Sequence, residues 1–181
     1  MRLHTYFKYI LYSDIIWKQN FKNPFQLEKA SKVVLNTTSK NVVSDKKLLL
    51  PSLLALELIT GQKLKWGIAK KSIAGFKLRK EQVISCKVTL QGKQMHSFLE
   101  RILDFLLPKF REFEGIKECS IDFHGNLSIG IYSLLVFPEL ENHFEAFEPI
   151  CGLDLTVVTS LQSKTINSLL WSGYGFPEKK S

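Results

Sequence analysis

The sequence predicts an α+β fold: a mainly antiparallel β-sheet with helices packed on one face and a long basic loop. Three observations indicate this class. Apolar residues recur at helical spacing in several segments, most clearly over 95–106, and short β-branched runs lie between these segments. The elements follow no strict βαβ repeat, which disfavours a parallel sheet. Finally, 45% of the 181 residues are hydrophobic, enough for a core, so we expect one domain spanning residues 1–181.

Residues 4–20 are expected to form the first helix. One stripe of this helix would carry Tyr6, Ile10, Ser13 and Trp17, flanked by a second with Phe7, Leu11 and Ile15. Asn23-Pro24 would end it, because proline disfavours a helical residue before it. A cleaved targeting presequence is the alternative, but lysines replace arginines and Asp14 intervenes, which favours a helix of the mature protein.

The next elements alternate between strand and helix. Ser31–Thr37 is β-branched and predicts a short strand, and the polar residues 36–45 predict a loop whose Asp45 can cap the next helix. Residues 46–60 predict an apolar helix that ends at Gly61 and holds Pro51 in its first turn.

Residues 61–80 contain seven Lys and Arg and no acid, and predict a strand that runs into a long exposed loop. The later elements are expected in this order: a strand over Val83–Leu90, an amphipathic helix through Met95, Phe98, Leu99, Ile102, Leu103 and Leu106 that stops at Pro108, a hairpin of Ser120–Phe123 and Leu127–Ile131, a strand over Leu153–Thr159, and a helix over Lys164–Trp171.

The charge is unevenly distributed along the chain, whose formal net charge is +8. Residues 1–111 hold 21 Lys and Arg against 7 Asp and Glu, whereas residues 112–181 hold 4 against 10. A basic part favours nucleic acid or an anionic membrane as a partner, and we expect it to face RNA. The acidic part continues the same fold and would face solvent or another protein. No apolar stretch reaches 18 residues, so no membrane span is expected.

Catalytic and metal sites are poorly supported by the sequence. The three cysteines, Cys86, Cys119 and Cys151, are odd in number and lie far apart, which argues against a disulfide framework and suits a reducing compartment. The four histidines are equally dispersed, and no Cys/His spacing resembles a zinc site. Asp122 and His124 are more simply explained as a turn than as an acid–base pair. The acidic residues of the C-terminal part match no cation loop: Glu139, Glu141, Glu145 and Glu148. We expect no enzyme activity and no cofactor.

Gly67 and Gly75 lie among lysines, but the spacing matches neither a Walker motif nor a dinucleotide-binding motif. The segment remains a basic loop that carries Trp66 and Phe76. Lysines can contact phosphates and aromatic rings can stack on bases, which is the functional interpretation. The alternative is a solvated loop whose two aromatic side chains are tucked into the core.

Several motifs resemble the family of large-subunit ribosomal protein five. The central ones are Gly61-Gln62-Lys63, Lys70–Arg79 (KKSIAGFKLR), Cys86–Leu90 (CKVTL) and Gly92. Others occur in the same order: Leu3-His4, Tyr6, Leu35-Asn36, Asp45–Leu48, Leu107-Pro108, Phe137-Pro138-Glu139 and Gly152-Leu153-Asp154. The resemblance spans nearly the whole chain.

This resemblance implies a structural constituent of the large ribosomal subunit that supports translation. Family members bind 5S rRNA in the central protuberance through the sheet face and adjoining loops. Their central loop reaches the peptidyl-site tRNA and a small-subunit head protein. Carried over by position, the rRNA-binding residues are Asn36, Gln62, Lys63, Lys87 and Thr89, and the loop residues are Lys70, Lys71, Ser72, Gly75, Phe76 and Lys77. Large-subunit rRNA and other ribosomal proteins are the further partners implied.

The chain also departs from the family pattern at three places. Thr37-Thr38-Ser39-Lys40 replaces a glycine-containing turn, Gln91 replaces an arginine, and Phe123-His124 replaces a Gly-Arg pair. These changes, with the bias toward Phe, Lys, Ile and Asn, favour an organellar ribosome in the mitochondrial matrix. A plastid or the bacterial cytoplasm is the alternative.

Two other functional classes remain open at this point. An RNA-modifying or RNA-hydrolysing enzyme would need a convergent catalytic site, for which Asp122 and His124 are the only titratable pair near a turn. A basic membrane-surface protein would use residues 4–20 as an amphipathic helix.

Overall fold

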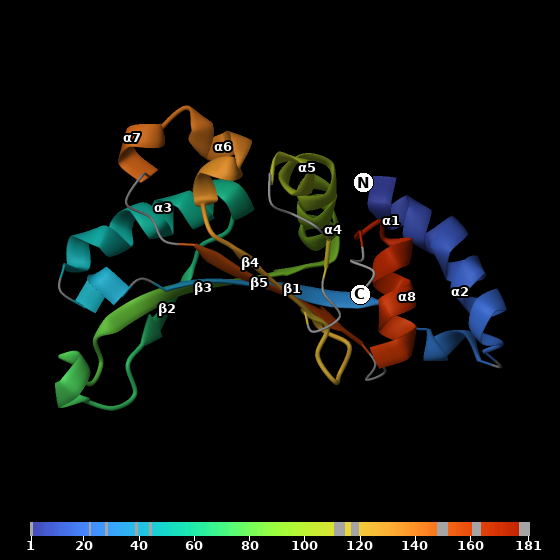
Figure 1. Cartoon of the computed structure of the whole chain (residues 1–181), viewed down its shortest axis with the longest axis horizontal. Helices are drawn as coiled ribbons and strands as arrows, with labels where there is room; N and C mark the ends of the chain where they lie inside the picture. Colours follow the sequence, from blue (N-terminus) through green and yellow to red (C-terminus); the bar gives the residue numbers. More distant parts are fainter. Residues whose placement is uncertain are drawn as a thin grey trace. The chain divides into compact units, whose positions relative to one another are not determined.

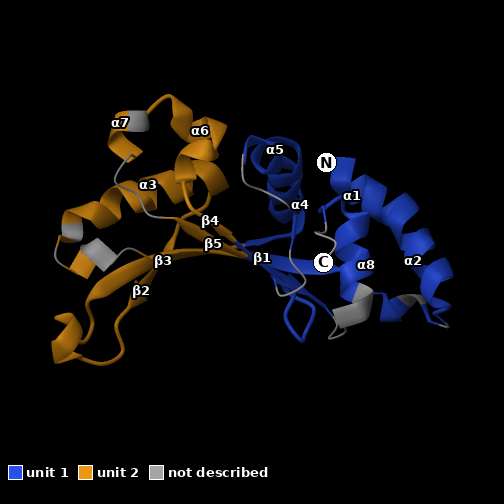
Figure 2. Ribbon diagram, in the orientation of Figure 1, with its two compact units in different colours: residues 1–33, 90–129, 156–181 blue, residues 34–89, 130–155 orange. Residues whose placement is uncertain are grey.

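The computed structural model describes residues 2–21, 23–27, 29–38, 40–43, 45–110, 115–116, 120–147, 152–160 and 164–177. The chain forms two compact units built from interleaved segments (Figure 2). Unit 1 takes residues 1–33, 90–129 and 156–181, and unit 2 takes residues 34–89 and 130–155. Each unit therefore draws residues from both the basic part and the acidic part of the sequence.

Five strands form one sheet in the order β2-β3-β1-β5-β4. Their bounds are β1 Ala30–Thr38, β2 Lys65–Ile68, β3 Val83–Gln91, β4 Leu127–Ile131 and β5 Leu153–Thr159. Strands β2 and β3 pair antiparallel, with Trp66 opposite Cys86 and a register shift after Gly67. The predicted α+β fold is confirmed, and so are the strands expected at 31–37, 83–90 and 153–159.

Helices supply the rest of the regular structure (Figure 1). Their bounds are α1 Arg2–Tyr6, α2 Tyr12–Gln19, α3 Leu49–Thr60, α4 Gly92–Arg101, α5 Leu107–Lys109, α6 Pro138–Glu141, α7 Phe144–Phe147 and α8 Lys164–Gly173. π-helical turns at Phe7–Leu11 and Ile102–Leu106 join α1 to α2 and α4 to α5. Within unit 2, α3, α6 and α7 lie on the same side of the strands. Over the described residues, no helix has both the length and the hydrophobicity to cross a bilayer.

The N-terminal helix is confirmed, and the structure shows which of its stripes enters the core. Phe7, Leu11 and Ile15 are buried, whereas Trp17 of the other stripe is 81% exposed. The Phe7 ring stacks on Tyr174, with ring centroids 5.4 Å apart. The helix ends at Gln19, where Asn20 takes a left-handed conformation, so it stops before the predicted Asn23-Pro24.

The predicted apolar helix is confirmed as α3, but it begins at Leu49, and Leu48 instead of Asp45 takes the capping position, without a side-chain cap bond. A 3-10 turn, Lys46–Leu48, precedes it, and the Leu48 amide donates to the Asp45 carbonyl oxygen at 3.2 Å. Pro51 lies in the first turn, where its missing N–H costs little. Gly61 ends the helix at φ +64° while its amide donates to the Glu57 carbonyl oxygen.

Two sequence predictions are wrong in detail. Pro108 does not stop the helix that begins at Gly92, because α5 continues to Lys109. A π-helical turn, Ile102–Leu106, ends two residues before the proline, and the Leu107 amide donates to the Ile102 oxygen, so the hydrogen-bond pattern has already shifted.

The predicted hairpin over 120–131 is reduced to a turn, since Ile121 and Leu127 pair only as an isolated bridge. The Asp122 carboxylate accepts hydrogen bonds from the backbone amide and the side-chain amide of Asn126. These local bonds form in place of the hydrogen bonds between two strands. Residues 117–119 lie outside the described part of the chain.

Candidate nucleic-acid interface

One face of strand β3 in unit 2 presents polar side chains to solvent. Cys86 and Val88 are buried, whereas the alternate residues Lys87 and Thr89 are exposed. Because successive side chains of a strand point to opposite faces, Lys87 and Thr89 share one face of the sheet. We call this the open face, since α3, α6 and α7 lie on the other side of the strands.

Strand β1, the neighbour of β3, follows the same alternation. Leu35 and Thr37 are buried, and the Thr37 hydroxyl donates to the Gly152 carbonyl oxygen at 3.0 Å. Asn36 and Thr38 alternate with them and lie on the open face. The Asn36 side-chain amide donates to the Thr38 hydroxyl at 3.2 Å, which orients it along that face. Thr37 belongs to the segment that replaces the glycine-containing turn of the family. Because its side chain is buried and hydrogen-bonded, it has a packing role.

Two lysines face each other on the open face. The antiparallel register places Lys65 of β2 directly opposite Lys87 of β3. Like charges in directly opposite positions repel, so this arrangement destabilises the free protein slightly. Continuing the register by two residues would bring Lys63, which is exposed, to the level of Thr89. The pattern thus concentrates positive charge along the edge of the open face.

Gly67 lies in β2, and so it is not part of a flexible phosphate loop. A side chain at this position would overlap the Ser85 hydroxyl on the paired strand. The missing Cβ lets the Ser85 side chain lie across β2. The glycine therefore has a packing role on the open face.

Gln62 and Lys63 occupy the short connection between α3 and β2. The backbone amide of Gln62 donates to the Thr60 hydroxyl at 3.3 Å, and the Gln62 side chain is half-buried. Gly61 turns the chain at this point, which fixes both residues at the start of β2. Asn36, Lys87 and Thr89 share the open face, with Gln62 and Lys63 beside it.

The predicted basic loop is a hydrogen-bonded hairpin over residues 69–82. Ile73 and Leu78 form an antiparallel bridge with N···O distances of 3.0 and 3.1 Å in the two directions. The Ser72 hydroxyl accepts from the Lys80 amide at 2.9 Å. A 3-10 turn, Ala74–Phe76, forms the tip, and Lys77 comes next in the left-handed region at φ +54°. This backbone bonding gives the hairpin a defined shape.

All six predicted loop residues are exposed on this hairpin: Lys70, Lys71, Ser72, Gly75, Phe76 and Lys77. Phe76 is 68% exposed, so it is not tucked into the core. Trp66 is 48% exposed and lies in β2, ahead of the hairpin in the chain. The hairpin residues form a group separate from the open face.

The sequence reasoning missed two features. Lys65 was absent from the predicted site, although its spacing of two from Lys63 could have indicated it. His4 and His96, taken as dispersed, lie with ring centroids 4.7 Å apart in unit 1. Burial lowers the pKa of His96, and the nearby His4 lowers it further. No group of three metal-binding side chains occurs among the residues whose placement is described.

The Asp122–His124 segment is a turn. Both carboxylate oxygens of Asp122 accept from Asn126, at 2.9 Å each. Burial alone would raise the pKa of Asp122, but these bonds and that from the His124 amide hold it below its ordinary value. The His124 carbonyl oxygen accepts from Asn167, which ties the turn to α8.

The remaining chemical candidates lead to no site. Burial, and to a smaller extent the charge of Glu57, raises the pKa of the Cys86 thiol to about 11, so it is a poor nucleophile. Cys119, Cys151 and Glu148 lie outside the described residues. The exposed positions of Gln91 and Phe123 make them surface features of unit 1.

Two family descriptions match this chain. Residues 23–79 match ribosomal protein L5, and residues 83–177 match the description of the C-terminus of the same ribosomal protein family. The chain belongs to the ribosomal protein L5 family. Large ribosomal subunit protein uL5m of Reclinomonas americana is 42% identical over 99% of this chain and 98% of its own length. The uL5 proteins of Hamiltonella defensa and Shewanella piezotolerans are 37% and 35% identical, each over 99% of both chains.

Membership in the L5 family establishes the general role of the protein. It is a structural constituent of the large ribosomal subunit and not an enzyme. Its partners therefore include rRNA and other ribosomal proteins.

Proposed function

We propose that the open face of unit 2 binds 5S rRNA in the central protuberance. The basic hairpin would contact the peptidyl-site tRNA and a protein of the small-subunit head. The residues on the rRNA side are Asn36, Gln62, Lys63, Lys87 and Thr89, and we add Lys65 because it lies opposite Lys87. The residues on the tRNA side are Lys70, Lys71, Ser72, Gly75, Phe76 and Lys77.

The observation that carries the rRNA proposal is the facing pair Lys65 and Lys87. Two exposed lysines on neighbouring strands repel in the free protein, and a phosphate bound at each of them would replace this repulsion with attraction. The neighbouring amide and hydroxyl of Asn36 and Thr89 offer hydrogen bonds to bases, sugars or phosphates. The directly opposed positive charges of Lys65 and Lys87 suit a polyanion.

The hairpin supports the tRNA proposal by its charge and shape. Five cationic side chains, Lys70, Lys71, Lys77, Arg79 and Lys80, are exposed on it, against the single exposed acid Glu81. The exposed Phe76 ring at the tip can stack on a base or sugar. Because the backbone bonds hold the tip in shape, binding requires little ordering of the chain.

We further propose that this ribosome is mitochondrial. The similarity to uL5m of Reclinomonas americana supports this compartment, although bacterial uL5 proteins are also similar. The plastid and the bacterial cytoplasm are the alternatives.

Salt-dependent binding to the cognate 5S rRNA tests the rRNA proposal. If the three lysines on the rRNA side, Lys63, Lys65 and Lys87, contact phosphates, the logarithm of the binding constant should fall with the logarithm of salt at a slope of about −2 to −3. An unrelated RNA of equal length serves as the control, and it should bind more weakly at every salt concentration. A flat salt response, or equal affinity for both RNAs, would exclude the proposal.

A further inference from the structure

The outer face of α3 is apolar, which is unusual for a helix at a protein surface. Its inner residues Ala55, Leu56 and Ile59 are fully buried in unit 2. On the opposite side, Leu50, Leu54 and Leu58 are 57%, 51% and 52% exposed. Because they are four residues apart, they form one row, which we call the leucine row. A helix with one face in solvent normally carries polar residues there.

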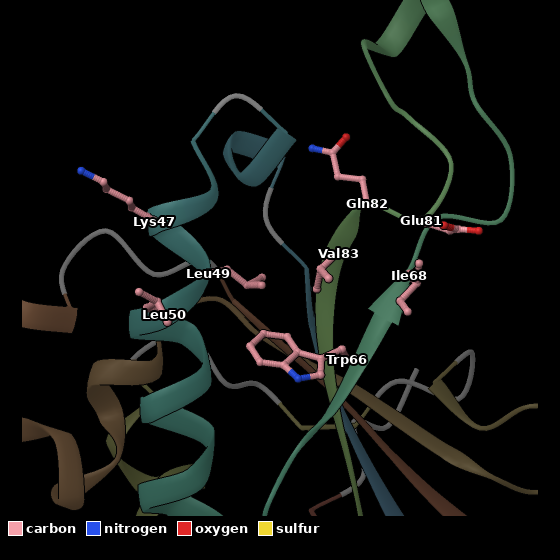
Figure 3. Close-up of a pocket in the computed structure, with 8 residues that line it drawn as sticks. All are labelled: Lys47, Leu49, Leu50, Trp66, Ile68, Glu81, Gln82 and Val83. Atoms are coloured by element: carbon pink, nitrogen blue, oxygen red, sulfur yellow. The ribbon is translucent and has the colours of Figure 1, made fainter.

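A pocket of about 540 Å³ adjoins the N-terminal end of this row (Figure 3). Its apolar wall comes from Leu49 and Leu50 of α3, from Trp66 and Ile68 of β2, and from Val83 at the start of β3. Figure 3 shows the Trp66 indole extending toward Leu49 and Leu50. Leu50 belongs to both the row and the pocket, so the two form one continuous apolar surface.

We propose that this surface docks an amphipathic α-helix of another protein. A row of leucines spaced by four residues is a ridge that can pack into a groove between the side chains of a second helix. The row runs over nine residues, Leu50–Leu58, with a rise of about 12 Å, which matches about two turns of the partner helix. The pocket at its end would receive one large apolar side chain of that helix.

The charges around the surface define the partner further. Lys47 lies at the pocket end of the row, and Glu57 lies between Leu54 and Leu58 in sequence, partly exposed. The partner helix should therefore carry an acidic residue near Lys47 and a basic residue near Glu57. This mixed pattern favours a protein partner over a polyanion.

RNA and lipid fit the surface poorly. Leucine side chains cannot stack on bases as aromatic rings do, and Lys47 is the single cation among the described residues that line the pocket. A membrane-binding face would place cations around its apolar centre, whereas Glu57 and Glu81 lie beside this one.

The leucine row and the open face lie on opposite sides of the strands in unit 2. Trp66 faces the helix side because it is paired with the buried Cys86, while the adjacent Lys65 is paired with Lys87. The protein partner and an RNA could therefore bind unit 2 at the same time. The docking inference does not depend on the rRNA proposal.

Photo-crosslinking in the assembled large subunit tests the inference. A photo-reactive amino acid replaces Leu54 in the full chain, and in parallel chains it replaces Thr38 on the open face or Tyr132, which is also highly exposed. We expect the Leu54 probe to label one segment of a second protein that has apolar residues at helical spacing. Labelling of rRNA, lipid or another copy of this chain from Leu54, or a yield no higher than at Tyr132, would overturn the inference. The Thr38 probe reports on the rRNA proposal alone.

A substitution separates docking from folding. Leu58→Asp in the chain with the probe at Leu54 should leave the circular dichroism spectrum and melting temperature nearly unchanged, because Leu58 is half-exposed. We expect the yield of the protein crosslink to fall at least tenfold. The matched control is Ile10→Asp, at a residue of similar exposure in unit 1, which should leave the yield unchanged. An equal loss with both variants, or no loss with Leu58→Asp, would contradict the docking surface.

Discussion

The facing lysines make a prediction in which stability and RNA affinity change in opposite directions. Lys65→Gln removes one charge of the Lys65–Lys87 pair. Like charges directly opposite on a sheet cost roughly 0.2 to 1 kcal/mol, and two exposed side chains belong at the low end of that range. The variant should therefore be more stable by a few tenths of a kcal/mol. With a urea m-value of about 1 to 3 kcal/mol/M, the unfolding midpoint should rise by about 0.1 to 0.3 M.

The same variant should bind 5S rRNA more weakly. Each phosphate contact contributes about 0.7 to 0.9 to the salt slope, so the slope should decrease in magnitude by that amount. Lys87→Gln should behave alike. In the double variant the gain in stability should not be additive, because one substitution already removes the repulsion, whereas the two losses of salt slope should add.

Urea unfolding at low and high salt and fluorescence anisotropy with labelled 5S rRNA measure both effects. The matched control is Lys18→Gln, which removes an exposed lysine of unit 1 and should change neither quantity. High salt should abolish the gain in stability, because it screens the exposed charges. A gain that survives high salt, or an unchanged salt slope for Lys65→Gln, would refute the reasoning.

Three further predictions concern other parts of the chain. Gln62→Ala or Thr89→Val should weaken 5S rRNA binding about 2- to 10-fold through one lost hydrogen bond, whereas Lys77→Ala mostly spares it. Equal losses in binding titrations of all three variants would contradict the division between open face and hairpin. Gly125→Ala should destabilise unit 1 by about 2 to 4 kcal/mol in urea unfolding, because φ is +77° and a Cβ would overlap Asn167. Gly75→Ala, where a Cβ meets nothing within 4 Å, is its control and should stay within about 0.5 kcal/mol. Asp122→Asn should lower stability at neutral pH and lose this effect in acid. The folded pKa of Asp122 lies below its ordinary value of 3.8, so the carboxylate stabilises the turn above pH 3.8 and less as the pH falls through the folded pKa. A pH-independent difference between the two proteins would argue against this origin.

The sequence predicted the fold where local signals agree with packing. Helix α3 ends at Gly61 and strand β5 spans Leu153–Thr159, as expected, because the stop signal and the β-branched run are both local. Periodicity alone did not separate the two stripes of the first helix, since aromatic residues occur in both. Phe7 faces the core because Tyr174 lies opposite it, and that partner is distant in sequence. Likewise, the sequence does not indicate the π-helical turn ahead of Pro108, so the continuation of the helix past the proline could not be predicted.

The candidate site was predictable in part. The alternation of Lys87 and Thr89 with buried residues was readable from the strand pattern, and the cations of the hairpin were evident from composition. The pairing of Lys65 with Lys87 required the register of two strands, which the sequence does not specify. The exposure of Leu50 and Leu54 was equally hidden, because an apolar helix in a sequence is normally expected to be buried.

The most direct test of the account is the density around unit 2 in the ribosome that contains this protein. The account predicts 5S rRNA against the open face, with phosphates within about 3 Å of the Lys65 and Lys87 amino groups. Solvent or a protein covering that face, with the 5S rRNA held elsewhere, would contradict it.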